Sequence, residues 1–564
     1  MVAPSLAGGP PGTLKPVSQV KIIAIGGVGE IGKNCTVIEQ GDDIVVVDCG
    51  LAFPNEEMLG VDIVIPDFTY LIENKDKLRG IFLTHAHEDH VGGLPYLLSE
   101  VKVPVYATEF THALMRQKLE EKLPIKSVEL KTFKPGDVIK AGAMTVEPIR
   151  VTHSVPDSCS MAIRTQFGIV LMTSDFKFDF TPVDGKLANI TRFGELGKEG
   201  VLALLSDSTN VERPGWGPSE RDVSAGLRKV MLEAEGRVLL TTFASNVHRI
   251  QQFYEVASET GRKVATVGRR MEQNIDICSR MGYIKIPKSV QIRLDEMKMY
   301  APNQIGVLTT GSQGEPMSAL VQMSKDEYSR LRIEEGDTLI YSARPIPGNE
   351  SAIWRTINRL FRQGAKVVYE APTPIHVSGH AYQEELKMMV NLTRPYYVAP
   401  VHGEARHQHL YLQMAGDMGY PPHRVFTMQD GVPLCMDATT ATLGERVPCG
   451  RVLVDFSGTP GISDEILRDR NNLAKDGVIS VAVVIDPEQG EVVGEPILQS
   501  KGFHGPEGLL ETAGEMLLEA LLELKREEVG DVDNLRHNVS DFVRRFIQKK
   551  TSLRPLVLPT IVEV

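Results

Sequence analysis

The chain has 564 residues, of which 42% are hydrophobic and 24% are charged, and its formal net charge is -12 at pH 7. This length predicts about three or four domain-sized units, and the apolar content is enough for buried cores, which excludes a disordered chain. The negative charge argues against a protein that coats nucleic acid by bulk electrostatics, but it leaves open a local basic groove.

The six cysteines are scattered and form no CxxC pair, so we expect free thiols in a reducing compartment. Apolar runs stay below the roughly eighteen residues that a membrane span needs. The Pro- and Gly-rich segment 1–19 lacks the charged and apolar regions of a signal peptide. We therefore expect a cytoplasmic protein with a flexible N-terminal tail over 1–19 and no membrane partner.

The first predicted strand, 20–25, is followed by Gly27, Gly29 and Gly32 in a GxGxxG pattern. Alone, this pattern is typical of a dinucleotide site. However, residues 34–39 have the pattern of a second strand rather than of the long helix that such a site requires. The dinucleotide interpretation is therefore disfavoured.

The densest group of metal-binding residue types follows a predicted strand at 80–84. His85 and His87 are two positions apart on an extended backbone, so both can face one ion. Asp89 and His90 fall in the next turn, where they can face a second ion. Imidazole and carboxylate without thiolate suit zinc or manganese in a catalytic site that keeps open positions. Core packing does not explain such a cluster.

Further polar side chains stand just past the ends of other predicted strands. Asp48 is placed to hydrogen-bond a ligand imidazole, with a simple strand-end turn as the alternative. His153 would complete the ligands of the first ion, and Asp175 can bridge two ions because a carboxylate has two oxygens. The alternation of strands and helices predicts a layered α/β domain. A common edge of strand ends is what a single site requires.

The HxHxDH pattern after an apolar strand resembles the signature of the metallo-β-lactamase superfamily, whose members are mostly dinuclear hydrolases. Later segments narrow the resemblance to the β-CASP branch, which acts on RNA or DNA: Asp207 resembles motif A, Ile375–Ala381 motif B and Ala399–Glu404 motif C. The phrases at 312–316 (SQGEP) and 345–350 (PIPGNE) are most similar to the ribonuclease J family. This resemblance extends over nearly the whole chain.

The resemblance implies an α/β protein with a metallo-β-lactamase αββα sandwich, an inserted β-CASP α/β domain and a small C-terminal α/β domain. The expected parts are 20–219 and 366–450 for the sandwich, 220–365 for the insertion, 451–463 for a linker and 464–564 for the C-terminal domain. Residues 221–365 contain 21 Lys and Arg against 16 Asp and Glu, so the insertion is basic in an acidic chain. A chance fluctuation on a solvated surface is the alternative.

The resemblance also implies two divalent metal ions per subunit, one held by His85, His87 and His153 and the other by Asp89, His90 and His402. Asp175 would bridge them. Zn2+ fits this set best, Mn2+ is the alternative, and Mg2+ fits less well. His380 would donate a proton to the leaving 3′ oxygen or bind the scissile phosphate, and Asp207 would orient His380 or a metal ligand from behind.

The implied function is hydrolysis of RNA phosphodiesters in RNA maturation and decay. The expected activity is a 5′-to-3′ exonuclease that prefers 5′-monophosphate ends, with additional endonuclease activity. A 5′-phosphate pocket is expected at His376, Ser378 and Gly379. The loop 242–249 can stack on a base and grip phosphate, although an ordinary helix N-terminus is an equal alternative. The remaining expected RNA contacts are Phe243, Ser245, Asn246, Arg249 and Asn349.

The C-terminal segment has no catalytic constellation. We predict a strand at 478–485 and helices at 506–527 and 534–549. The first helix places leucines at helical spacing, which predicts self-association as a homodimer or homotetramer, with packing inside the chain as the alternative. These leucines are Leu509, Leu510, Leu517, Leu518, Leu521 and Leu522. The expected partners are single-stranded RNA and, through the resemblance, RNA-degradation or ribosome-associated assemblies.

Three functions other than that of a ribonuclease are compatible with parts of the sequence. The insertion and motifs B and C disfavour a small-molecule hydrolase of the same fold. The complete set of seven ligand positions disfavours a non-catalytic RNA-binding subunit. A DNA-directed nuclease stays open, since recognition of the 2′-hydroxyl cannot be derived from the chain.

Overall fold

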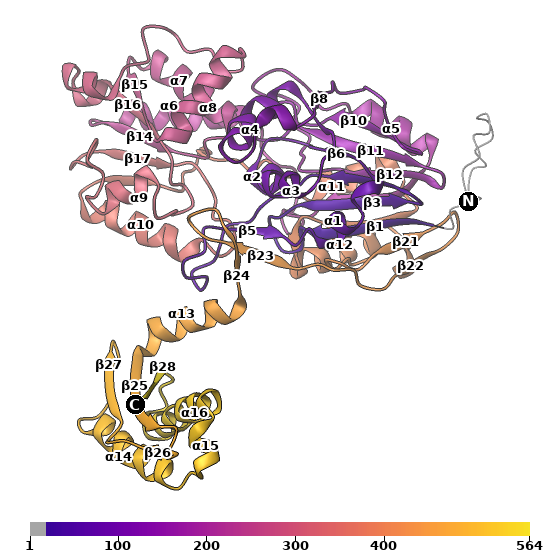
Figure 1. The fold of residues 1–564 in the computed structure, drawn as a ribbon. Coiled ribbons are helices and arrows are strands. Elements are labelled where there is room, and N and C mark those ends of the chain that lie inside the picture. The colour runs from indigo at the N-terminus through magenta and orange to yellow at the C-terminus, as the bar shows by residue number, and fades with distance from the viewer. Residues whose placement is uncertain (1–18) are drawn as a thin grey trace. The chain divides into compact units, whose positions relative to one another are not determined.

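The computed structural model describes residues 19–564 and all side chains among them except those at 526 and 527. The predicted tail, 1–19, therefore lies outside the described residues apart from its last position. The described chain forms two compact units (Figure 1). One contains residues 19–53 and Ile63–Val452, and the other contains Pro54–Asp62 and Leu453–Val564.

Two sheets face each other in the larger unit. Their strand orders are β22-β21-β1-β3-β4-β6-β7-β8 and β19-β13-β12-β11-β10-β9. The strands are β1 (Val20–Gly26), β3 (Cys35–Gln40), β4 (Asp43–Val47), β6 (Leu78–Phe82), β7 (Val105–Ala107), β8 (Leu130–Thr132), β9 (Ile139–Ala141), β10 (Met144–Arg150), β11 (Cys159–Thr165), β12 (Gly168–Met172), β13 (Val201–Asp207), β19 (Tyr397–Val401), β21 (Leu434–Met436) and β22 (Ala441–Leu443). Side chains of both sheets, among them Ile22, Phe82 and Met161, share one buried core.

Helices cover the outer faces of these two sheets (Figure 1). On the second sheet, α5 (Ile190–Glu199), α11 (Gln383–Thr393) and α12 (Ala405–Asp417) bury apolar side chains against the strands. On the first sheet, α4 (Glu109–Lys122) lies against β7 and β8, and α3 (Leu94–Glu100) lies against α4. Two short helices, α1 (Thr69–Glu73) and α2 (Glu88–Val91), complete this side. The result is a four-layered αββα sandwich.

Parallel pairing brings several strand ends to one edge of each sheet. β4 pairs in parallel with β6, and β13 pairs in parallel with both β12 and β19. The chain leaves three of these strands through non-glycine residues with left-handed backbone: Asp48 (φ 63°), Ser174 (φ 54°) and His402 (φ 51°). Such conformations cost about 1–3 kcal/mol each and concentrate where function over-determines the backbone. This edge therefore has the backbone features of a functional site.

The inserted part of the larger unit is a parallel sheet with strand order β15-β16-β14-β17-β18. Its elements are α6 (Val223–Glu233), β14 (Val238–Thr241), α7 (Val247–Glu259), β15 (Lys263–Val267), α8 (Arg269–Arg280), β16 (Ile305–Thr309), α9 (Ala319–Ser324), β17 (Thr338–Tyr341), α10 (Glu350–Arg362) and β18 (Lys366–Val368). Helices α6 to α8 bury one face of the sheet, and α9 and α10 bury the other. Near-continuous apolar strands are expected when both faces are covered.

The smaller unit is built around β25 (Val478–Asp486), which pairs with β26 (Glu491–Val492), β27 (Ile497–Lys501) and β28 (Leu556–Glu563). Its helices are α13 (Asp464–Asp476), α14 (Leu509–Leu522), α15 (Arg526–Gly530) and α16 (Val532–Thr551). The segment predicted as a linker contains two short strands, β23 (Arg451–Val454) and β24 (Pro460–Ile462). The sequence predicts one helix at 506–527, whereas the structure has two helices there, α14 and α15, and α15 continues to Gly530.

Some of the leucines that α14 carries at helical spacing are buried inside the smaller unit. Leu509, Leu517 and Leu521 are buried in its core, whereas Leu522 is 67% exposed. Self-association through this helix therefore stays a prediction that rests on its outer side.

All six cysteines, which lie among the described residues, are free, as predicted. Within residues 19–564, the helices are too short or too polar to cross a bilayer.

If the outer side of α14 joins two copies of the chain, Leu522→Glu should shift sedimentation towards smaller species, because a buried unpaired charge is costly. Thr512→Glu, which adds the same charge at another exposed position of α14, should not. Unchanged sedimentation of the Leu522 variant would leave packing within one chain as the only use of the stripe.

Candidate metal centre

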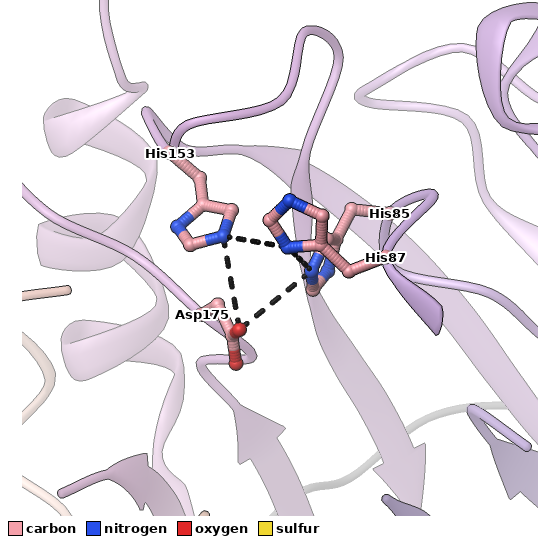
Figure 2. Close-up of side chains that lie close together, drawn as sticks. All are labelled: His85, His87, His153 and Asp175. Atoms are coloured by element: carbon pink, nitrogen blue, oxygen red, sulfur yellow. Dashed lines mark hydrogen bonds and ion pairs between the residues drawn. The ribbon is translucent and has the colours of Figure 1, made fainter. Parts of the chain in front are cut away.

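Three imidazoles and one carboxylate converge on a single point past the ends of β6, β10 and β12 (Figure 2). His87 Nδ1 lies 3.0 Å from His85 Nε2 and 3.2 Å from His153 Nε2. Burial lowers the pKa of His87 to about 4 and the pKa of His85 and His153 well below the ordinary histidine value. Three neutral imidazoles that turn lone pairs to one point fit a cation.

A second group lies beside the first and consists of Asp89, His90 and His402 with the same Asp175. His90 Nε2 lies 3.3 Å from Asp175 Oδ2 and 3.5 Å from Asp89 Oδ2, and His402 Nε2 lies 3.8 Å from Asp89 Oδ2. Burial alone would lower the pKa of His90, but the surrounding carboxylates raise it well above the ordinary value. The negative charge that holds a proton on His90 can hold a cation instead, with release of that proton.

Asp175 is shared by both groups, and its environment fits two cations. Burial acts to raise the pKa of this carboxyl, but the neighbouring histidines, His90 first, hold it well below its ordinary value. Its Oδ1 atom is buried and has no hydrogen-bond partner among the described residues. Because an unsatisfied buried carboxylate oxygen is costly, a ligand for it is expected. The donor set fits one cation on each side of Asp175.

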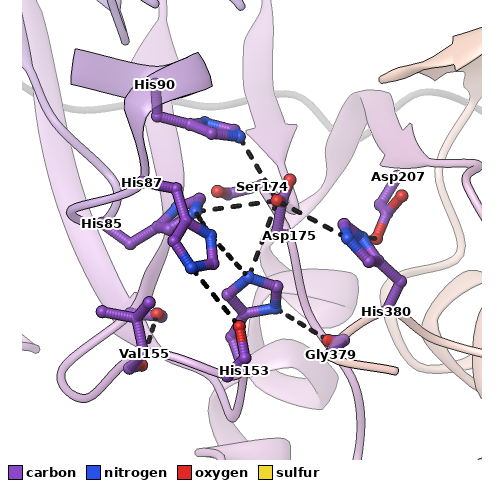
Figure 3. A network of polar contacts seen from close by, with 12 residues as sticks. His85, His87, His90, His153, Val155, Ser174, Asp175, Asp207, Gly379 and His380 are labelled. Atoms are coloured by element: carbon purple, nitrogen blue, oxygen red, sulfur yellow. Dashed lines mark hydrogen bonds and ion pairs between the residues drawn. The ribbon is translucent and has the colours of Figure 1, made fainter. Parts of the chain in front are cut away.

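Hydrogen-bond partners outside the cluster hold Nδ1 of five histidines around the site, and two of these pairs, His153 with Gly379 and His380 with Asp207, are drawn in Figure 3. The pairs are His85 with Thr84 Oγ1 (3.0 Å), His90 with Asp48 Oδ2 (2.8 Å), His153 with the Gly379 carbonyl (2.8 Å), His402 with Asn34 Oδ1 (3.0 Å) and His380 with Asp207 Oδ2 (2.8 Å). Such partners fix the tautomer and the ring orientation of a ligand. Asp48 contacts the His90 imidazole, as predicted, and the role of His90 as a metal ligand stays a prediction.

Asn34 is a residue of this site that sequence reasoning missed. Its buried amide contacts all three residues of the second group: Nδ2 donates to the Asp89 carbonyl (3.0 Å) and lies 3.1 Å from His90 Nε2, while Oδ1 faces His402 Nδ1. The amide therefore ties α2 to the segment after β19. It fixes the relative positions of Asp89, His90 and His402, which come from distant parts of the sequence.

The glycine pattern near the N-terminus explains how Asn34 reaches the site. A Cβ at Gly27 (φ 92°) would lie 2.4 Å from Asn34 Oδ1, so only glycine fits there. The Gly27 carbonyl accepts the backbone N–H of His402 (2.8 Å), and β2 (Val28–Gly29) pairs with β20 (Gly403–Glu404). The glycines thus join β1 to the segment after β19. The glycine pattern was the feature of the sequence that could have identified Asn34, because glycines allow the backbone to pass close to its side chain.

His380 and Asp207 form a hydrogen-bonded pair next to Asp175 (Figure 3). His380 Nε2 lies 3.9 Å from Asp175 Oδ2. Burial acts against protonation, but Asp207 and Asp175 together raise the pKa of His380 to about 9. These three residues are close enough to hold a cation. However, His380 Nδ1 and Asp207 Oδ2 already satisfy each other, so the arrangement favours a protonated imidazole over a third ion.

The segment 375–381 supplies a hydroxyl and an imidazole beside this pair. Ser378 Oγ accepts hydrogen bonds from Asn210 Nδ2 (2.8 Å) and from the His380 backbone N–H (3.2 Å), which leaves its own proton for a ligand. Burial and then Arg249 lower the pKa of His376 well below the ordinary value. Arg249 Nη1 lies 3.3 Å from His376 Nδ1. This contact leaves Nε2–H of His376 as a donor.

Two predicted RNA contacts, Arg249 and Asn246, are wrong because both side chains are buried. Arg249 pairs with both oxygens of Glu220 (2.8 and 2.9 Å) and also donates to Ser342 Oγ. Asn246 caps α7 by accepting the Arg249 backbone N–H (3.1 Å). The alternative of an ordinary helix N-terminus holds at these positions. Arg249 instead links the inserted part to the segment 375–381.

Among the other predicted RNA contacts, Gly379 is occupied by a contact within the protein, and the remaining residues are half-buried. The Gly379 carbonyl is occupied by His153, and a Cβ there would lie 2.7 Å from that ring. Phe243 and Ser245 are half-buried, with Phe243 packed against a core of the inserted sheet. Asn349 is half-buried, and its Nδ2 lies 3.4 Å from Gln313 Oε1. RNA binding at these positions stays a prediction.

Four family descriptions match successive parts of the chain. Residues 28–209 match the metallo-beta-lactamase superfamily, 235–360 match "Ribonuclease J, beta-CASP domain", 366–421 match "Zn-dependent metallo-hydrolase RNA specificity domain", and 465–564 match "Ribonuclease J C-terminal domain". Ribonuclease J2 of Bacillus subtilis is 39% identical, covering 98% of this chain and 100% of that protein. Ribonuclease J of Thermus thermophilus is 42% identical, covering 97% and 96%.

Among solved structures, a protein of unknown function from Enterococcus faecalis matches with a TM-score of 0.53 and 18% identity, over 74% of this chain and 100% of that one. This likeness shows the fold alone. Fold and site together define a metal-dependent hydrolase with a metallo-β-lactamase domain and a β-CASP insertion. The full-length relatives make the assignment specific: the chain belongs to the ribonuclease J family and is a metal-dependent ribonuclease.

Asn34→Ala should weaken the binding of one of two divalent ions by about 10- to 100-fold, because an outer partner of the ligands is lost. Titration calorimetry of the apoprotein with Zn2+ or Mn2+ measures both binding steps. Asn210→Ala is the matched control, since that amide bonds Ser378 and the His380 carbonyl and none of the proposed ligands. Two unaltered binding steps in the Asn34 variant would contradict its role.

Arg249→Met should lower the free energy of unfolding by about 3–5 kcal/mol, because Glu220 would be left buried and unpaired. Urea denaturation measures this loss. The double variant Arg249→Met with Glu220→Gln should lose less than the sum of the two single variants. Normal stability with weakened RNA binding would restore the predicted RNA contact.

Proposed function

We propose that this ribonuclease is a 5′-to-3′ exonuclease that prefers 5′-monophosphate ends, with additional endonuclease activity on single-stranded RNA, in RNA maturation and decay. The observation that carries the proposal is the placement of Ser378, His376 and His380 on one segment beside Asp175. A phosphate that these donors hold would keep the next phosphodiester near the metal ligands. Membership of the family supports an activity on RNA, because the relatives are named as ribonucleases.

We propose that His85, His87 and His153 hold one ion, that Asp89, His90 and His402 hold the other, and that Asp175 bridges them. Zn2+ suits the imidazole-rich first group best, and Mn2+ is the alternative. When bound, the two ions supply Lewis-acid activation of water and of the phosphoryl group. The neutral imidazoles of the first group are ready for a cation because their burial already disfavours protons.

His380 is the proposed general acid for the leaving 3′ oxygen. Its Nδ1 is held by Asp207, so Nε2 faces Asp175 and can carry the proton to be donated. Burial opposes the protonated form of this imidazole, but Asp207, whose Oδ2 lies 2.8 Å from Nδ1, raises its pKa and favours that form. An alkoxide leaves poorly without such a proton, and a positioned acid contributes about 10²–10⁴-fold in rate.

The 5′-phosphate pocket is proposed at Ser378 and His376. Their hydroxyl proton and Nε2–H are two neutral donors for a monophosphate, and the buried Lys177, whose Nζ lies 3.4 Å from the Ser378 carbonyl, holds the segment behind them. A triphosphate would be too large for this position, and a hydroxyl would leave the donors without partners.

The proposed location of the protein is the cytoplasm, in agreement with its free thiols, and its proposed oligomeric state is a homodimer or homotetramer.

His380→Ala should keep two bound ions but lower kcat by about 10²–10⁴-fold. In the parent, kcat should fall as pH rises through the raised pKa of His380, because the acid is active only when protonated. This alkaline limb should disappear in the variant. Metal analysis and a pH series of single-turnover rates test both points. Loss of an ion in His380→Ala would make the residue a ligand.

Cleavage rates on one RNA that carries a 5′-monophosphate, a 5′-triphosphate or a 5′-hydroxyl test the pocket. The monophosphate should be fastest in the parent, and Ser378→Ala should reduce this preference because one donor is lost. Ser99→Ala, at an exposed position of α3, is the control. Equal parent rates on all three ends would defeat the proposed direction and leave the ribonuclease assignment intact.

A further inference from the structure

Two exposed aromatic side chains, Phe180 and Trp216, lie side by side on loops of the larger unit. Their ring centroids are 6.1 Å apart, and the ring planes are tilted by 53°. Phe180 is 57% exposed and Trp216 51% exposed, whereas Phe176 and Phe178, from the same loop as Phe180, are buried. Tryptophan side chains are on average highly buried. Two neighbouring exposed rings therefore call for an explanation outside the core.

A single buried carboxylate fixes both loops. Glu385, in the first turn of α11, accepts the backbone N–H of Phe178 on Oε1 (2.8 Å) and that of Gly217 on Oε2 (2.9 Å). Gly217 directly follows Trp216, and α11 directly follows the segment 375–381 that contains Ser378 and His380. The backbones of the two loops are thus anchored to the helix that follows the proposed pocket.

A second set of contacts joins the loops to each other and to Ser378. The buried Lys177 Nζ donates to the Pro218 carbonyl (2.9 Å) and lies 3.4 Å from the Ser378 carbonyl. Thr181 Oγ1 donates to Ser219 Oγ (2.9 Å). The loops that carry the aromatic pair are therefore hydrogen-bonded to each other and, through Lys177, to the segment that contains Ser378.

We propose that Phe180 and Trp216 form a platform on which unpaired bases of the RNA substrate stack. Stacking on aromatic rings tolerates every base, so it suits an enzyme that degrades varied sequences. The exposed Arg221, whose Nη2 donates to the Pro182 carbonyl beside Phe180 (3.2 Å), offers positive charge for the strand's phosphates. The inference rests on the ribonuclease activity and is independent of the proposed 5′ preference.

RNA is favoured over a second copy of the chain as the occupant. Stable protein interfaces bury about 1,200 Å² or more in total, and two rings provide only a small part of such an area. The loops that carry the pair are also hydrogen-bonded to Lys177, which contacts the Ser378 carbonyl of the proposed substrate site, and to Glu385 of α11. A pair of exposed rings on loops that are hydrogen-bonded to the nuclease domain matches the needs of a flexible single strand.

The two tryptophans of the chain allow a direct test. Trp354→Phe leaves Trp216 as the sole tryptophan, and Trp216→Phe leaves Trp354, which is also exposed and lies on α10 of the inserted part. Each full-length variant is titrated with a phosphorothioate oligouridylate of about ten nucleotides, which covers a typical site. Trp216 emission should be quenched with saturation, and Trp354 emission should not change.

Binding strength separates stacking from phosphate contacts. Trp216→Ala should weaken binding of the oligouridylate by about 10-fold and raise KM with kcat and metal content unchanged. Trp354→Ala should have no effect. An abasic oligonucleotide of the same length should bind the parent and Trp216→Ala equally. Unquenched Trp216 emission in a complex that fluorescence anisotropy shows to be formed would overturn the proposal. An altered sedimentation coefficient in Trp216→Ala would also overturn it, in favour of a contact between copies.

Discussion

The carboxylate of Asp175 is the group on which the rest of the site depends. Imidazole nitrogens of His85, His90, His153 and His402 lie 3.3–3.7 Å from its two oxygens, and His380 lies at 3.9 Å. A buried carboxylate in such a ring stays ionised and attracts cations on both sides. The two sheets and the strained residue before Asp175, Ser174, hold it at the point where their strand ends meet.

A shell of outer hydrogen bonds turns this cluster into an ordered site. Thr84, Asp48, Gly379, Asn34 and Asp207 each bind one Nδ1, and they come from both sheets and from the segment before α11. Preorganised ligands bind a metal without the cost of ordering side chains. The same segment carries the proposed phosphate donors, so substrate contacts and metal ligands share one support.

Much of this site could be predicted from the sequence because its ligands follow short apolar strands in recognisable motifs. Spacing predicted that His85 and His87 lie together, and strand ends predicted that Asp175 lies between the two groups; the structure brings these side chains together in that way. Burial could not be predicted in the same way. Arg249 has the sequence surroundings of an RNA contact, but its partner, Glu220, is 29 positions away and meets it only in the folded chain. Asn34 escaped notice because its three contacts come from distant segments.

The central claim is that Asp175 joins two cations in one centre, and metal content of Asp175→Asn tests it most directly. The substitution keeps the size of the side chain and removes its charge. Mass spectrometry of metals in the folded protein should find fewer than the two ions per chain of the parent, with RNA cleavage abolished and the melting temperature little changed. Two retained ions with full cleavage in this variant would contradict the account.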